Sequence, residues 1–431
     1  MDSRDFRFWW LAMLGMGLGM QMLEVAIGWQ VYALRHSPLD LGWIGLAEFL
    51  PLFVLAIPAG HLADRLPRRL VFAGALLAAI AVGVCLAVFS LAHVSSVLAY
   101  LALAAGAGTV TATGSPAARA MPPALVPADL LQSAMTLRTI ASQTAGVLGP
   151  ALGGLLYGVT PVLVYLLSAA MCLLAAVSVV MIRARPAAAS VPVPAARPPA
   201  TVGSVLAGLR FVGRTPVLLG AILLDLLAVL FGGAVGLLPV FARSILHVGP
   251  EGLGVLRAAP AVGALVAAAL ITRRPVGGRA GQLLLLVVGI YGASIVVFGL
   301  SRIFVLSLAM LAVGGFADMF SMNIRSTTVV LATPDPLRGR VSAVELVFVS
   351  ASNQLGTFES GLTAALVGTV PAVVGGGLIT ITIALTWSRL FPALGRIDRL
   401  QDIRPEAEPE PSAGLGLPRN ADLRPPGRAG A

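Results

Sequence analysis

Long uninterrupted apolar runs constrain this chain more than any other feature of its sequence. A helix needs about 20 apolar residues to cross the hydrocarbon of a bilayer, and runs of that length follow one another from the N-terminus to residue 390. Lipid offers no hydrogen-bond partners, so spanning backbone forms helices or a closed barrel. The runs are continuous and do not alternate between apolar and polar residues, which excludes a barrel. The sequence therefore predicts an all-α integral membrane protein.

Twelve transmembrane helices are predicted, in two sets of six. The first set is expected at Phe8–Tyr32, Leu41–Ala63, Leu70–Leu91, Val97–Ala118, Leu131–Gly158 and Val162–Ile182. The second set is expected at Val217–Phe241, Leu253–Ile271, Leu283–Leu300, Ile303–Val329, Val341–Val367 and Ala372–Leu390. We expect two six-helix bundles over residues 1–182 and 215–391. A linker over 183–214, rich in Ala, Pro and Val, cannot fold alone, and a Pro- and Glu-rich tail over 392–431 is expected to be disordered.

The distribution of arginine predicts the orientation. The formal net charge is +10, but the arginines lie between apolar spans and form no soluble basic face, so nucleic acid is not an expected partner. One set of alternate loops contains most of them, including those of 183–214, while the other contains little beyond Arg35, Arg243 and Arg302. Arginine-rich loops face the cytoplasm. We therefore expect a multi-pass protein of a bacterial-type cytoplasmic (inner) membrane with both termini cytoplasmic.

Several classes of activity are excluded by residue type. All 29 basic residues are arginine, and a chain without lysine can form neither a P-loop nor a Schiff base. Any energy that the protein uses must therefore come from a gradient or from a partner subunit. No nucleophile clusters with a base, and the four histidines have no ligand spacing. We predict no enzyme, no cofactor and no metal site.

A weak internal repeat relates the two sets of spans. Val126–Leu130 opens the fifth span as Thr333–Leu337 opens the eleventh, and in that register Gly149 and Gly154 fall opposite Gly356 and Gly361. Transporters built from a duplicated helical unit bind substrate at the interface of the repeats. The repeat thus predicts pseudo-symmetric bundles with a site between them.

Ionisable residues inside apolar spans are costly, which makes them functional candidates. Glu24 lies mid-span and shares a helix face with Gln21, three residues away. A carboxyl group removed from water favours its neutral form and can exchange a proton as water access changes. We prefer Glu24 and Asp318 as proton or cation sites; for each, the alternative is a structural carboxyl paired with an internal arginine or a backbone group. The candidates for binding substrate or protons are Gln21, Glu24, Asp225, Asp318, Arg325, Asn353 and Glu359.

The loop after the second span contains a recognisable motif. It reads Gly60-His61-Leu62-Ala63-Asp64-Arg65-Leu66-Pro67-Arg68-Arg69. This resembles the signature loop between helices two and three of the major facilitator superfamily. The resemblance implies a cytoplasmic conformational latch formed by Gly60, Asp64, Arg65, Arg68 and Arg69, to which we add Arg119. The alternative is a basic loop that only sets topology.

The fifth span contains a second motif, Gly146-Val147-Leu148-Gly149-Pro150-Ala151-Leu152-Gly153-Gly154. It resembles part of the motif associated with exporters of that superfamily. Glycine permits close helix approach, and proline removes one backbone hydrogen bond and allows a bend. We assign Gly149, Pro150, Gly153 and Gly154 to a helix-bend motif, with ordinary small-residue packing as the alternative.

Three further segments, Gly28–Tyr32, Thr333–Ala343 and Ser352–Gly361, resemble the enterobactin-exporter branch of the superfamily. The resemblance implies a secondary transporter that exports siderophores or other amphipathic small molecules in exchange for protons. We separately expect a monomer in the lipid bilayer. Two alternatives stay open, an importer or facilitator of a small metabolite with the same fold and a membrane subunit that depends on a partner.

Overall fold

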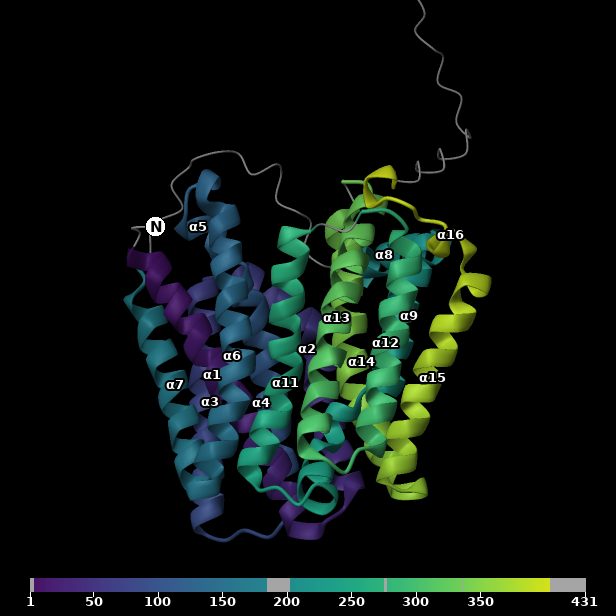
Figure 1. The fold of residues 1–431 in the computed structure, drawn as a ribbon. Helices are drawn as coiled ribbons and strands as arrows, with labels where there is room; N and C mark the ends of the chain where they lie inside the picture. Colours follow the sequence, from purple (N-terminus) through teal and green to yellow (C-terminus); the bar gives the residue numbers. More distant parts are fainter. Residues whose placement is uncertain (1–3, 184–201, 275–276, 336, 404–431) are drawn as a thin grey trace, which may run out of the picture.

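The computed structural model describes residues 4–183, 202–274, 277–335 and 337–403, and these form helices joined by short connections (Figure 1). The long helices of the first half are α1 (Arg4–Arg35), α2 (Pro38–Arg65), α3 (Arg68–Leu91), α4 (Val97–Arg119), α6 (Leu131–Val159) and α7 (Pro161–Met181). Those of the second half are α9 (Pro216–Gly232), α11 (Pro250–Arg273), α12 (Ala280–Leu300), α13 (Phe304–Ala332), α14 (Arg338–Val367) and α15 (Thr369–Leu390). Short elements are α5 (Pro122–Leu125), η1 (Ala128–Leu130), α8 (Val202–Arg214), η2 (Ala234–Leu237), α10 (Leu238–Val240), η3 (Phe241–Ile245), α16 (Pro392–Gly395) and η4 (Leu400–Asp402).

Ten helical segments among the described residues are long and apolar enough to cross a membrane. One of them runs from α9 through η3 and is interrupted only at Gly233, which is not helical. The helices α6 and α14 are 29 and 30 residues long and lie among these spans, at the places of the fifth and eleventh predicted spans (Figure 1). Both contain many polar and small residues, and each packs against a helix of the other half. The predicted all-α membrane fold is confirmed.

Each half has its own internal packing, and the two halves meet along two edges. In the first half α1 packs against α6 and α7, and α3 against α4 and α7; in the second half α11 packs against α13, and α12 against α13 and α15. The contacts between the halves run along α2 with α14 and along α6 with α11. The central space between the halves is surrounded by the faces of these helices that do not take part in the two edges.

Glycines make both edges possible. A Cβ placed on Gly154 of α6 would lie 2.8 Å from the Cα atom of Gly254 in α11. On the other edge, a Cβ on Gly361 of α14 would lie 2.6 Å from the Cα atom of Gly42 in α2. Backbones approach this closely only where side chains are absent. The two crossings are related in the way that the sequence repeat predicts.

The other two glycines of the repeat, Gly149 and Gly356, also have corresponding positions. A Cβ on Gly149 would lie 3.4 Å from the carbonyl oxygen of Leu18 in α1, the first helix of its half. A Cβ on Gly356 would lie 3.0 Å from the carbonyl oxygen of Val229 in α9, the first long helix of the second half. Gly149 and Gly356 therefore have equivalent positions, each where its helix packs closely against the first long helix of its own half.

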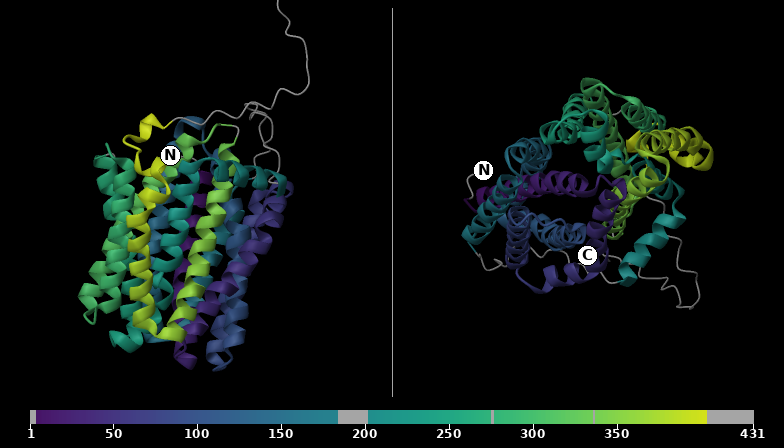
Figure 2. Two further views of the ribbon diagram at one scale, coloured as in Figure 1. Left: turned by 90° about the vertical axis from the view of Figure 1, so that its right-hand side faces the viewer. Right: turned by 90° about the horizontal axis from the view of Figure 1, so that it is seen from below.

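The two ends of the helical bundle differ in how the halves are joined. We call the end that carries Arg4, α5, α8 and α16 the terminal face, and the other end the opposite face (Figures 1 and 2). Near the opposite face, one apolar core joins both halves and includes Ile27, Tyr32 and Leu41 together with Leu237, Phe241 and Leu253. Near the terminal face, the apolar cores belong to one half each. The halves are thus sealed together at the opposite face and separated at the terminal face.

Two segments contain structure that the composition of the sequence did not predict. The segment 183–214, expected to be a linker without its own fold, ends in helix α8, which packs against α14 and α9; residues 184–201 lie outside the described residues. The tail was expected to be disordered from residue 392, which is wrong as far as Ile403. There the carbonyl oxygens of Ile397 and Asp398 accept hydrogen bonds of 3.0 and 2.9 Å from the first amides of α12. Residues 404–431 lie outside the described part of the chain.

Candidate functional site

A cavity of about 630 Å³ lies between the two halves. Its walls come mainly from α1, α2, α4 and α6, with contributions from α13 and α14. It extends from mid-span carboxyl groups to Arg119, the last residue of α4 at the terminal face. The polar and charged lining residues are Gln21, Glu24, Glu48, Thr111, Ser115, Arg119, Arg138, Thr139, Ser142, Gln143 and Gln354.

The deep end of the cavity is crossed by an ion pair between the halves. Arg257 of α11 donates a hydrogen bond to the carboxylate of Glu24 in α1. The side chain of Arg257 is 13% exposed and that of Glu24 is 41% exposed. Arg257 is therefore held mostly inside the protein, while Glu24 is open to the water of the cavity.

A second polar contact crosses between the halves on the other edge. Gln354 of α14 donates a hydrogen bond of 3.0 Å to the carboxylate of Glu48 in α2. Glu48 also lies within electrostatic reach of Glu24 and Arg257. Two carboxyl groups thus lie within electrostatic reach of one guanidinium at the deep end of the cavity. A proton bound to either carboxyl group would balance the charge of this cluster.

Contacts near the opposite face seal the cavity beyond this cluster. The hydroxyl groups of Tyr32 in α1 and Ser244 in η3 are hydrogen bonded at 2.7 Å. The guanidinium of Arg243 lies 5.8 Å from the ring centroid of Trp29, and the rings of Trp43 and Phe358 are 5.3 Å apart. Each of these contacts joins the two halves, so each must break if the opposite face is to open.

The cavity has an apolar wall and a basic mouth. Methionines 13, 16, 20 and 322 line it together with Leu52. Methionine is flexible and polarisable, so a wall rich in it can adapt to apolar groups of different shape. Arg119 and Arg138 also line the cavity and are electrostatic neighbours of each other. The cavity therefore offers apolar surface beside a site of positive charge.

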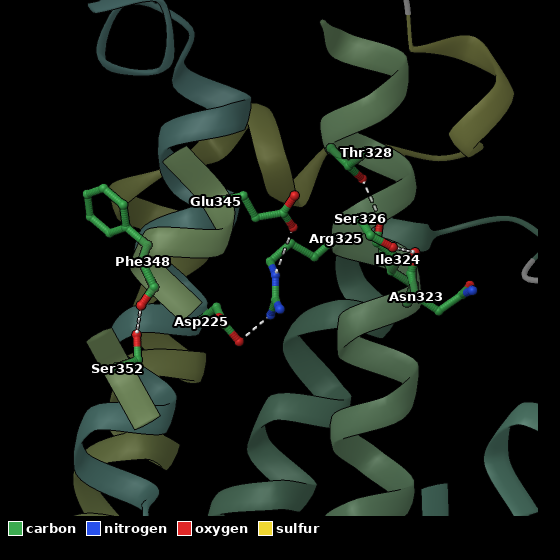
Figure 3. Close-up of polar contacts among 9 residues, drawn as sticks. All are labelled: Asp225, Asn323, Ile324, Arg325, Ser326, Thr328, Glu345, Phe348 and Ser352. Atoms are coloured by element: carbon green, nitrogen blue, oxygen red, sulfur yellow. Dashed lines mark hydrogen bonds and ion pairs between the residues drawn. The ribbon is translucent and has the colours of Figure 1, made fainter. Parts of the chain in front are cut away.

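A separate charged cluster is buried inside the second half (Figure 3). Arg325 of α13 donates a hydrogen bond to Asp225 of α9, and its Nε atom lies 3.9 Å from a carboxylate oxygen of Glu345 in α14. Arg325 is 5% and Asp225 is 8% exposed. Asp318 lies within electrostatic reach of both. The cluster joins α9, α13 and α14 through buried charged contacts, which is the arrangement of a structural ion-pair network.

The basic residues at the end of the predicted latch bind the first half. Arg68 donates a hydrogen bond of 2.7 Å to the carbonyl oxygen of Ala120, beyond α4. Arg69 donates hydrogen bonds of 2.6 and 2.8 Å to the carbonyl oxygens of Ile182 and Val180 at the end of α7. Cations suit the carboxyl ends of helices, where carbonyl groups lack partners. The side chains of Gly60, Asp64 and Arg65 lie outside the described part of the structure.

The comparisons with known proteins agree with this architecture. The family of transmembrane secretion effectors, within the major facilitator group, matches residues 1–412. The chain belongs to that family. Its members share the major facilitator fold, and the ribbon in Figure 1 has the two related helical halves expected of it.

Similar proteins of this superfamily are known by sequence and by structure. The chain is 28% identical to the enterobactin exporter of Citrobacter koseri over 386 residues, which cover 88% of this chain and 90% of that one. It is 28% identical to an enterobactin exporter of Escherichia coli over 79% of this chain and 80% of that one. A bacterial homologue of the human lysosomal transporter Spinster, in an inward-facing and unoccupied conformation, has a TM-score of 0.72 at 15% identity, covering 91% of this chain and 99% of the other. A D-xylose–proton symporter has a TM-score of 0.63 at 13% identity, covering 91% and 99%.

The major facilitator fold distributes the seven predicted substrate or proton candidates over several places. Gln21 and Glu24 line the cavity. Asp225 and Arg325 lie in the buried cluster, where Arg325 pairs with Asp225 and not with Asp318 of its own stripe. The exposed Asn353 donates a hydrogen bond of 2.8 Å to the carbonyl oxygen of Val349 in its own helix.

Three further residues, Glu359, Gln354 and Arg257, have contacts that the sequence did not predict. Glu359 accepts a hydrogen bond of 2.8 Å from Thr363 of its own helix, and Gln354 makes the polar contact between the halves. Arg257, which pairs with Glu24, was missed although it lies inside an apolar span. The rule that selected the acidic candidates applies equally to a basic residue in such a span, and it could have found Arg257.

Proposed function

We propose that this protein is a proton-coupled exporter of amphipathic small molecules that works by alternating access. The proposal rests first on the ion pair between Glu24 and Arg257, which joins the two halves at the deep end of a water-accessible cavity. A proton that binds Glu24 removes the charge that holds Arg257. Substrate that binds in the cavity would break this pair and open the opposite face, and the freed Glu24 would then take up a proton from the other solution.

The exchange would involve Glu48 as well. In the state described here, Glu24 and Glu48 face a cavity that reaches the terminal face. When the opposite face opens, the same carboxyl groups would meet the other solution and take up protons there. The return to the present state would release those protons into the cavity, because Arg257 again favours the charged form of Glu24.

The proposed direction follows from the orientation. The positive-inside rule favours a cytoplasmic position for the terminal face, and the cavity would then load from the cytoplasm of a bacterial inner membrane. With a proton gradient directed inward, proton entry would drive the loaded substrate outward. The relatives named enterobactin exporters support the same direction.

The proposed substrates are siderophores or other amphipathic compounds. The methionine wall suits an apolar part, and the polar face around Gln21 and Gln143 suits hydroxyl, amide or ring oxygen groups. Arg119 and Arg138 at the mouth suit negatively charged groups. We assign the binding of anionic substrate groups to Arg119 and Arg138. We do not assign it to Arg325, because that side chain is buried and already paired with Asp225.

We further propose that the loop from Gly60 to Arg69 acts as a latch in the other state. Arg68 and Arg69 bind carbonyl groups of the first half while the terminal face is open. On closure, the loop and Arg119 would contact the second half. Charge-assisted hydrogen bonds made in only one state shift the equilibrium between states.

Purified protein in liposomes tests the function. A pH gradient is imposed, and uptake of catecholate and hydroxamate siderophores and of lipophilic drugs is measured in vesicles with known protein orientation. The proposal expects movement against the proton gradient. Movement in the same direction as the protons would favour an importer, and an inactive but folded chain would favour a subunit that depends on a partner.

A further inference from the structure

The short helix α8 directly precedes a helix that is long and apolar enough to cross a membrane. It ends at Arg214, and only Thr215 separates it from α9, which begins a membrane span at Pro216. Figure 2 shows α8 lying crosswise to the long helices, at the rim of the terminal face. Because the span begins only two residues after α8 ends, we place α8 next to the boundary between the hydrocarbon core and the headgroups.

One face of α8 is docked on the protein. Val212 is 2% exposed and packs in an apolar core with Leu218 and Val341. Gly208 lies so close to α14 that an added Cβ would be 3.0 Å from the carbonyl oxygen of Arg340 and 3.2 Å from the side chain of Val344. This face fixes the helix against the first turns of α14 and α9.

The outer face carries an apolar stripe beside a basic stripe. Leu206 and Leu209 are 44% and 42% exposed, and their spacing of three residues puts them on one side of the helix. Arg210 and Arg214 are also exposed and lie one turn apart. Around the helix Gly213 falls between Leu206 and Leu209, and a Cβ added there would have no neighbouring atom within 4 Å. Neither arginine pairs with an acidic side chain among the described residues.

This pattern is that of a helix in a membrane interface. Such helices insert apolar side chains at the boundary of the acyl chains and hold arginine at the level of the phosphate groups. A leucine side chain exposed to water is not stabilised by burial. A leucine side chain inserted among lipid acyl chains is stabilised by the hydrophobic effect. The guanidinium groups of Arg210 and Arg214, which have no acidic partner among the described residues, complement anionic headgroups.

We propose that α8 is an interfacial helix that binds anionic phospholipids of the surrounding bilayer, with Leu206 and Leu209 in the acyl boundary and Arg210 and Arg214 on the headgroup phosphates. The lipid occupies a surface that the protein leaves uncovered, and its binding is independent of any transported substrate.

Site-directed labelling of the full chain tests the position of the helix. Cys85 and Cys172 are replaced by serine and alanine, and a nitroxide is attached at Leu206→Cys in nanodiscs of phosphatidylcholine with or without phosphatidylglycerol. The proposal expects the label to be accessible to oxygen and protected from a water-soluble relaxation agent when phosphatidylglycerol is present. A label that is fully accessible from water in both lipids would overturn it.

The arginines are tested by lipid retention in native mass spectrometry, with unmodified cysteines. Each arginine near an anionic surface is expected to change lipid affinity about fivefold, so Arg210→Gln with Arg214→Gln should retain far less phosphatidylglycerol than the parent. Arg302→Gln, an exposed arginine of the opposite face, is the matched control and should retain as much as the parent. Equal retention by the double variant and the control would refute the role of the headgroup.

Discussion

Replacing Gly154 with alanine should shift the protein away from the state described here. The added Cβ would lie 2.3 Å from the carbonyl oxygen of Pro250, and 2.8 Å from the Cα atom of Gly254, at the crossing of α6 and α11. An ordinary contact needs about 3.5 Å, so the two backbones would have to separate by about 1 Å. Both are backbone atoms that cannot turn aside, so the strain falls on the contact between the halves.

The expected size follows from the cost of overpacking. Inserting a methyl group where the structure is already closely packed costs about 1–3 kcal/mol. If this strain is relieved when the halves separate at the opposite face, the equilibrium between the two states shifts about 5- to 150-fold. A shift of this size is large enough to be seen in a distance distribution.

The assay measures distances between nitroxides by electron spin resonance. Labels at Val159 and Ile303, which are 73% and 63% exposed near the opposite face, report the separation of the halves in a background without native cysteines. Gly146→Ala is the control, because its Cβ would meet only Ala261 of α11, at 3.5 Å. It also reproduces the gain in helix propensity, about 1 kcal/mol, of exchanging glycine for alanine.

Gly154→Ala should lengthen the distance between the labels, and Gly146→Ala should leave it as in the parent. Identical distributions in the two variants, with identical thermal stability, would refute the reasoning that this crossing seals the opposite face.

Three further predictions concern the other contacts between and within the halves. Gly361→Ala, whose added methyl group would lie 2.6 Å from a backbone Cα atom of α2, should lengthen the same label distance; an unchanged distance would limit the effect to one edge. Arg325→Gln should lower the free energy of unfolding by about 3–5 kcal/mol, because it leaves Asp225 buried without its cation; combining it with Asp225→Asn should recover part of the loss in a chemical unfolding titration, and no recovery would argue against the pair. Arg257→Gln should cost about 1 kcal/mol or less in unfolding, because Glu24 is 41% exposed and can be hydrated, yet reduce gradient-driven transport at least tenfold in liposomes; a normal rate would remove the pair from the mechanism.

The sequence predicts the long helices well because their cause is local. A run of apolar residues is visible without knowing its neighbours, and the repeat of Gly154 and Gly361 is visible as a spacing. The structure gives these glycines the same role in the two halves, since each permits a backbone crossing. What the spacing could not supply is the partner of each glycine, which lies on a helix distant in sequence.

The candidate site could be predicted only in part. An acidic residue in a span attracts attention, and Glu24 does line the cavity. Its partner Arg257 is 233 residues away, and no local pattern links the two. Asn353 and Gln354 are adjacent and point about 100° apart around the helix. The uncertainty of a predicted span boundary is larger than this rotation, so the sequence could not decide which of the two contacts the other half. Helix α8 was missed because its segment was judged by composition, although an amphipathic spacing was present.

Proton movement driven by a substrate gradient tests the central proposal most directly. Liposomes that contain the protein and an internal pH indicator are exposed to a gradient of a transported compound, without any imposed pH difference. The account predicts that protons move opposite to the compound. It predicts that this movement is lost in Glu24→Gln and kept in Glu251→Gln, a control in the first turn of α11. Transport of the compound with no movement of protons, or the same proton movement in both variants, would contradict the account.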